Sequence, residues 1–132
     1  MMTLESINPD DLYKPSSYTH VVVSTGNRLA FIAGQAASDA QGTLVGQGDL
    51  DAQARQAFAN LGRALAAAGA RPDQVARITI FVVGHRPEFL PVIEAARVAV
   101  FGNHKPTDTL VGIETLAEPG YLIEVDAIAV LD

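Results

Sequence analysis

The stretch DLDAQARQAFANLGRALAAAGARPDQVARITIFVV, residues 49–83, decides the fold. Its first part repeats apolar residues at three- and four-residue steps, which places them on one face of a helix over 49–69. Its last part, residues 75–83, is rich in β-branched residues and is typical of a mostly buried strand. An amphipathic helix followed closely by a buried strand predicts helices packed on a sheet. The predicted apolar stripe consists of Ala54, Ala57, Phe58, Leu61, Leu65 and Ala68.

Signals for helix ends support this prediction and indicate a second helix. Asp49 or Asp51 is placed to cap or charge the first N-terminus, and Gly69 suits the position just past the C-terminus. The segment PEFLPVIEAARVAVFG, residues 87–102, predicts the second helix. Because proline is tolerated only in the first turn of a helix, its regular part is expected to begin near Leu90.

Predicted strands lie on both sides of the helices. Residues 20–34, HVVVSTGNRLAFIAG, predict a β-hairpin, because Gly26 and Asn27 between two apolar runs can supply positive φ angles. Residues 106–113, PTDTLVGI, predict a strand entered through a proline, and residues 121–132, YLIEVDAIAVLD, predict the last strand. The order ββαβαββ predicts an α/β or α+β arrangement, with two helices over one face of a mixed sheet.

Composition limits the classes of function. The chain has 132 residues, 48% hydrophobic and 18% charged, which predicts one globular domain over residues 1–132. Its net charge of −6 and scattered basic residues argue against nucleic acid or an acidic membrane surface as a partner. No signal peptide or membrane-spanning run is visible, so a cytoplasmic protein is expected. Without cysteine, and with three histidines that show no metal-ligand spacing, no metal site is expected.

The last strand carries the most informative polar residues. Strand alternation places Glu124 and Asp126 on one face, opposite Ile123 and Val125. Two carboxylates in an apolar strand indicate either a sheet face that meets water or a cleft in which one of them transfers protons. The spacing alone favours the water-facing interpretation. Asp108, at the mouth of the proline-entered strand, is open to a similar choice between a catalytic acid and a turn residue.

Several segments together resemble the Rid family, also called the YjgF or L-PSP endoribonuclease-like family. The matching pieces are Ser17 with Tyr18, the tripeptide at 33–35, the two helices, the strand entry at Pro106 and the final IEVDAIAV. They occur in the family's order across nearly the whole chain. The resemblance implies an α+β, chorismate-mutase-like fold and a homotrimer with clefts between subunits. It also implies hydrolysis of enamine and imine metabolites, such as 2-aminoacrylate, to 2-keto acids and ammonia without a cofactor or metal.

The family's functional residues fall on identifiable positions of this sequence. In well-known members a glutamate positions the attacking water, and a tyrosine and a glycine N–H shape the pocket. By this resemblance they correspond to Glu124, Tyr18 and Gly34. The arginine that binds the substrate carboxylate falls on Asp108, which reverses the charge. Ala33, Ile93 and Leu110 stand at three further substrate-binding positions, where the family has serine, asparagine and cysteine.

This reversal changes the expected activity. A guanidinium holds a carboxylate through two parallel hydrogen bonds, whereas Asp108 would repel it. We therefore expect a poor 2-imino-acid deaminase from the family's arginine-lacking branch, with Glu124 and Asp108 as the candidate catalytic residues of one cleft. Three functions stay open: a hydrolase or deaminase with a changed small-molecule substrate, a non-catalytic metabolite-binding homotrimer, and an interaction or chaperone-like role of the trimer surface. The retained Glu124 favours the first, and the negative charge argues against an endoribonuclease.

Overall fold

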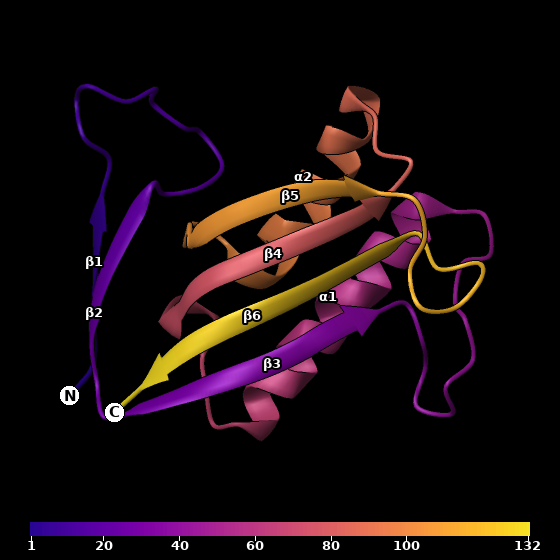
Figure 1. Cartoon of the computed structure of the whole chain (residues 1–132). Coiled ribbons are helices and arrows are strands. Elements are labelled where there is room, and N and C mark those ends of the chain that lie inside the picture. The colour runs from indigo at the N-terminus through magenta and orange to yellow at the C-terminus, as the bar shows by residue number, and fades with distance from the viewer.

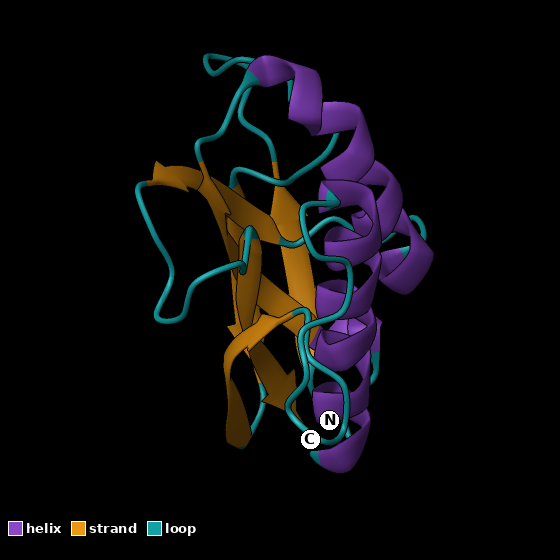
Figure 2. Cartoon of the chain, turned by 90° about the vertical axis from the view of Figure 1, so that its right-hand side faces the viewer, coloured by secondary structure: helices purple, strands orange, loops and turns teal.

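A computed structural model describes residues 1–132 and contains a four-stranded mixed sheet with two helices on one side (Figures 1 and 2). The strand order is β3 (Arg28–Ala36), β6 (Ile123–Leu131), β4 (Val75–Val83) and β5 (Thr107–Ile113). Strands β4 and β5 are parallel, and the other two neighbouring pairs are antiparallel. The predicted α+β class, with two helices over one face of a mixed sheet, is confirmed.

The two helices are α1 (Leu50–Ala67) and α2 (Leu90–Phe101). The Asp49 carboxylate caps α1 by accepting a hydrogen bond from the Ala52 backbone N–H at 3.0 Å. Gly69 follows the helix with a φ of 74°, a left-handed conformation that glycine adopts without steric cost. Neither helix is long and apolar enough to cross a bilayer. Short 3₁₀ turns at Pro72–Gln74 and Pro87–Phe89 precede β4 and α2.

The hydrophobic core lies between the helices and one face of the sheet. The predicted stripe of α1 is buried there, except that Ala68 is half-buried. Along β4 and β6 every second side chain points into this core, so the residues between them face the opposite side. The largest members of the core are Phe58, Leu61, Leu65, Val75, Ile78, Ile80, Val82, Ile93, Phe101, Ile123, Val125 and Leu131.

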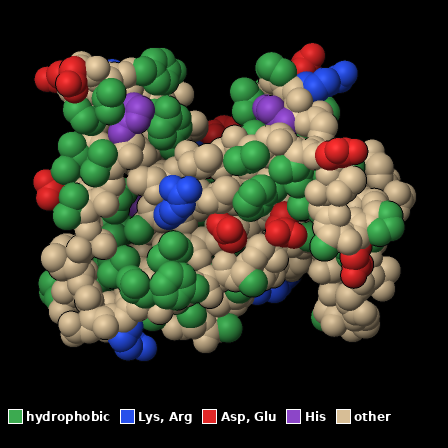
Figure 3. Space-filling model, viewed as in Figure 1, with side chains coloured by type: hydrophobic (Ala, Val, Ile, Leu, Met, Phe, Trp, Pro, Cys, Tyr) green, Lys and Arg blue, Asp and Glu red, His purple; other side chains and the backbone are tan.

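The other face of the sheet has no helix over it. Figure 3 views this open face and shows hydrophobic side chains gathered there beside charged ones. Phe31 is 71% exposed and Leu29 is 57% exposed, and both lie on β3 with side chains on this face. Because soluble domains rarely leave large apolar side chains together in water, this surface has the character of an interaction site.

The prediction that β2 and β3 form a hairpin was wrong. Strand β2 (Val21–Thr25) pairs instead with β1 (Thr3–Ile7), which the sequence analysis did not predict, and the two form a separate antiparallel ribbon (Figure 1). A two-residue turn of the expected type needs positive φ at both central residues, and Asn27 does not have one. The chain therefore passes from one sheet into the other instead of folding back on itself.

The loop between β1 and β2 returns to the beginning of β5. The buried Thr19 donates its backbone N–H to the Pro106 carbonyl at 3.2 Å and its hydroxyl to the Lys105 carbonyl. These two bonds hold the residues just before Thr19 beside the first residues of β5, close to Asp108. This contact between distant parts of the chain builds one wall of the candidate site.

Candidate functional site

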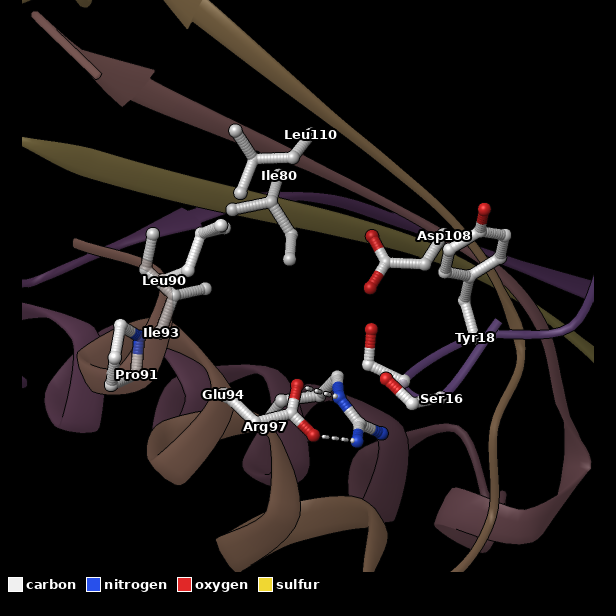
Figure 4. Close-up of a pocket in the computed structure, with 11 residues that line it drawn as sticks. Ser16, Tyr18, Ile80, Leu90, Pro91, Ile93, Glu94, Arg97, Asp108 and Leu110 are labelled. Carbon is white, nitrogen blue, oxygen red and sulfur yellow. Dashed lines mark hydrogen bonds and ion pairs between the residues drawn. The ribbon is translucent and has the colours of Figure 1, made fainter. Parts of the chain in front are cut away.

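A cavity of about 530 Å³ opens between β5, α2 and the loop ahead of β2 (Figure 4). At its polar end the Asp108 carboxylate points inward from β5, with Ser16 and Tyr18 beside it. Its other end is apolar. The cavity therefore presents the Asp108 carboxylate to a ligand at one end and an apolar surface at the other. The apolar lining consists of Ile80, Leu90, Pro91, Ile93 and Leu110.

Asp108 is held in an environment that disfavours its charged form. Its Oδ1 atom is buried and accepts no hydrogen bond from the protein. Burial raises the pKa of Asp108 to about 6, a rise that Arg97 opposes, Glu94 reinforces and Arg77 opposes. The carboxyl group therefore changes charge near neutral pH, and a ligand that brings a hydrogen-bond donor or a positive charge would favour the ionised form.

An ion pair on α2 forms the floor of the cavity below Asp108 (Figure 4). Arg97 is 2% exposed and donates from Nη2 and Nε to the two carboxylate oxygens of Glu94, at 2.6 and 3.1 Å. Its Nη1 donates to the His104 carbonyl at 3.4 Å. The guanidinium nearest Asp108 is thus already neutralised by a bidentate partner.

The sequence analysis missed this ion pair. A usable signal was present, because Arg97 follows Ile93 by four residues and so lies on the apolar face of α2. A charged residue within a buried stripe needs a partner, and Glu94, three residues earlier, is within reach. Spacing therefore could have identified both residues, although not their position under β5.

Four of the predicted site residues meet in this cavity: Asp108, Tyr18, Ile93 and Leu110. They come from three separate segments, the loop ahead of β2, α2 and β5. Tyr18 packs its ring edge-on against His20, with centroids 5.4 Å apart. Four of the seven sequence positions taken from the resemblance therefore meet within a single chain, with Asp108 beside Tyr18 at one end of the cavity (Figure 4).

The remaining predicted residues lie on the other side of the sheet. Glu124 lines a smaller cavity of about 290 Å³ near the end of β3. Gly34 lies against it, since a Cβ atom at that position would overlap the Glu124 carboxylate. Ala33 is exposed in the irregular part of β3, between Ile32 and Gln35. No group of three or more histidine, cysteine or acidic side chains is arranged to hold a metal ion.

Strand register explains why the two predicted catalytic carboxylates are separated. Asp108 pairs with Ile78, whose side chain faces the helices. Glu124 pairs with Phe81, three residues farther along β4, which points to the open face. Within one chain Asp108 and Glu124 therefore lie on opposite faces of the sheet, and a cleft that contains both requires a second subunit.

The fold and the cavity together define a class: a small α+β domain with a ligand-sized cavity between a helix and a sheet edge. Residues 10–131 match the family model described as Endoribonuclease L-PSP. The chain is 31% identical to a RutC family protein of Synechocystis, with 98% of each chain covered. The chain therefore belongs to the Rid family, which is also called the YjgF or L-PSP family.

Solved structures agree with this assignment and with the predicted chorismate-mutase-like fold. A Rid-family protein of unknown function from Yersinia pestis, YyfB, is 40% identical with a TM-score of 0.91, over 97% of this chain and 98% of that one. TdcF of E. coli, solved with bound serine, is 25% identical with a TM-score of 0.68, over 79% of this chain and 81% of that one.

Proposed function

We propose that this protein is a small-molecule hydrolase of the deaminase type that acts on C–N compounds between the subunits of a homotrimer, in the cytoplasm and without a cofactor. We further propose that it is weak or inactive on 2-imino acids. The observation that carries the proposal is the charge of the cavity that Asp108 lines. Asp108 points into it, and the nearest guanidinium, that of Arg97, is held by Glu94.

Charge separates this protein from a 2-imino-acid deaminase. A substrate carboxylate in the cavity would approach Asp108 and would have to displace Glu94 from Arg97 to find a cation. Both effects oppose binding, because an unpaired charge in a partly buried site is costly. A substrate without a carboxylate avoids both. The serine bound to TdcF supports a small metabolite as the kind of ligand for this protein. This chain would select a metabolite with a different charge.

Glu124 is the proposed general base. In the trimer, the open face of one subunit would cover the Asp108 cavity of its neighbour and bring Glu124 to the substrate. Glu124 would take a proton from water while the water oxygen adds to the imine carbon. For a protonated imine, Glu124 then gives this proton to the nitrogen of the resulting carbinolamine. The C–N bond breaks, the nitrogen leaves as an amine or ammonia, and the hydroxyl proton passes to Glu124 and on to solvent as the carbonyl compound forms. The apolar side chains exposed on that face support such an assembly.

A pair of coupled assays tests the proposal. An amino-acid oxidase generates 2-imino acids in situ, whereas an amine oxidase generates imines that lack the carboxylate. We expect acceleration above spontaneous hydrolysis for the carboxylate-free imines, lost in Glu124→Gln, and little or none for 2-iminopropionate. A large acceleration with 2-iminopropionate that Glu124→Ala abolishes would contradict the proposal. Asp108→Arg should move activity toward the 2-imino acids if the rest of the site is intact.

A non-catalytic metabolite-binding trimer is the second candidate. It is favoured by the location of Glu124 on the far face of the sheet from the Asp108 cavity of its own chain. If the subunits assemble without bringing these groups together, the cavity would still bind a ligand but would lack a base. A ligand that raises the melting temperature without any turnover in either coupled assay would favour this candidate.

A further inference from the structure

We infer that the Asp108 cavity selects a primary ammonium with a compact apolar body and no carboxylate. The ammonium binds at the Asp108 carboxylate, and the apolar body lies along Leu90, Ile93 and Leu110. This inference rests on the cavity of the proposed function and names the class of ligand that it takes. It is independent of whether the site also hydrolyses an imine.

The charges around the cavity favour a cation. Glu94 and Arg97 neutralise each other through two hydrogen bonds, at 2.6 and 3.1 Å. Asp108 is left as the negative group without such a partner, and its buried Oδ1 accepts no hydrogen bond from the protein. A buried acceptor of this kind is costly until a donor fills it, and an ammonium supplies both a donor and the opposite charge.

The shape of the cavity determines the size and the apolar character of the ligand body that is attached to the ammonium. Asp108 and Ser16 lie at one end and the apolar side chains at the other, with open space between them (Figure 4). An ammonium has three N–H donors, so it can bond to Asp108 and also to the hydroxyl oxygen of Ser16, which lines the same cavity. A volume of about 530 Å³ suits a small branched or aromatic body packed against the apolar wall.

The protonation state of Asp108 adds a pH signature. The pKa of Asp108 is near 6, and the ligand ammonium stays charged far above that value. The charged groups around Asp108 are Glu94 and Arg97 from α2 and Arg77 from β4, and Tyr18 of the loop ahead of β2 lies beside it. Affinity for the ammonium should therefore rise between pH 5 and pH 7 as Asp108 ionises, by about tenfold per pH unit well below its pKa.

Three probes of similar shape and different charge test the inference on the wild-type protein. They are 3-methylbutylamine, 3-methylbutan-1-ol and 4-methylpentanoate, titrated by calorimetry at pH 7.5. We expect the amine to bind at least about tenfold more tightly than the alcohol, because a hydrogen bond between charged groups replaces a neutral one. The carboxylate should bind more weakly than either. In a series of longer alkylamines, each added methylene should improve affinity about threefold to fourfold until the wall is filled.

Variants assign the effect to Asp108. Asp108→Asn should remove the preference for the amine over the alcohol and also its pH dependence. Asp73→Asn is the matched control, because Asp73 is an exposed carboxylate in a surface ion pair with Arg71. It should leave all affinities unchanged. If Asp108→Asn does not fold, the comparison of amine, alcohol and carboxylate on the wild-type protein still decides the question.

Failure of this inference and failure of the proposed function give different results. Equal binding of amine and alcohol, or tighter binding of the carboxylate, overturns the inference even if an imine is hydrolysed in a Glu124-dependent way. Conversely, selective amine binding without turnover in either coupled assay supports the inference and contradicts the catalytic proposal.

Discussion

Asp108 combines the proposed ligand contact with a cost to stability, which is common where a site needs a poorly solvated charge. Its carboxylate lies over the ion pair of Glu94 and Arg97, and burial raises its pKa to about 6. The sequence analysis predicted that Asp108 stands where the family has its arginine, and this stays a prediction. The direction of the pKa change depends on burial and on Glu94 and Arg97, which a sequence position alone does not reveal.

The pH dependence of stability tests this description of Asp108. The folded state holds the Asp108 proton more tightly than the unfolded state, in which the carboxyl pKa is near 3.8. The stabilisation from this group is complete below about pH 4 and is lost as the pH rises through about 6. We expect Asp108→Asn to be more stable than the wild type at pH 7.5 by up to about 3 kcal/mol, and nearly equal at pH 4. Urea unfolding at the two pH values measures this, and a difference that is the same at both would contradict it.

Gly34 offers a second test at the residue scale. A Cβ at this position would overlap the flexible end of the Glu124 side chain and force it to turn away. We expect Gly34→Ala to change the carbon-13 resonance of the Glu124 carboxyl group, at a cost in stability below about 1 kcal/mol. Gly62→Ala is the matched control, because Gly62 lies in α1 with its nearest contact, a Val100 methyl, at an ordinary 3.8 Å. It should raise stability by about 0.5–1 kcal/mol and leave Glu124 unchanged.

Among the elements, α2 has a second role beyond covering the sheet. Its apolar stripe buries Ile93 and Ala96 in the core, and the same face carries Arg97 into the floor of the cavity. The helix therefore connects core packing to the charge of the site. The ribbon of β1 and β2 has a comparable role, because the loop between them carries Ser16 and Tyr18 to the start of β5.

Removing the guanidinium from α2 should be strongly destabilising. Arg97→Met deletes three hydrogen bonds and leaves the Glu94 carboxylate without its partner beside Asp108. We expect a loss of about 2–4 kcal/mol in the free energy of unfolding at pH 7.5. Arg55→Met removes an exposed pair with Asp51 and should cost less than about 0.5 kcal/mol. Urea unfolding of both variants measures the difference, and equal losses would argue against a structural ion pair in α2.

For the whole molecule, the open face of the sheet determines whether a single chain can form the complete proposed site or needs a second subunit. Its exposed apolar side chains include Phe31 and Leu29, and the same face carries Glu124. Burial of such a surface between subunits would stabilise an assembly and would also bring Glu124 into contact with a neighbouring chain. Assembly and catalysis would then depend on the same surface.

Light scattering after size exclusion tests the proposed trimer. We expect a mass of about 42 kDa, three times the 13.9 kDa of one chain. Phe31→Asp should reduce the mass toward that of a single chain, because it places a charge among the exposed apolar side chains of the open face. Val98→Asp is the matched control, since Val98 is 44% exposed but lies on α2, away from the open face. A wild-type monomer, or an equal effect of both variants, would contradict the assembly.

The sequence by itself determined both helices and five of the six strands of this protein, and it indicated the family. The stripe of α1, the cap at Asp49 and the alternation in β6 follow from periods of 3.6 and 2, which neighbouring residues define without the rest of the chain. Only the tertiary structure decided that β2 pairs with β1, that Arg97 lies under Asp108, and that Asp108 and Glu124 face opposite sides of the sheet. These three features depend on register and packing between segments far apart in the sequence, and local periodicity carries no information about either.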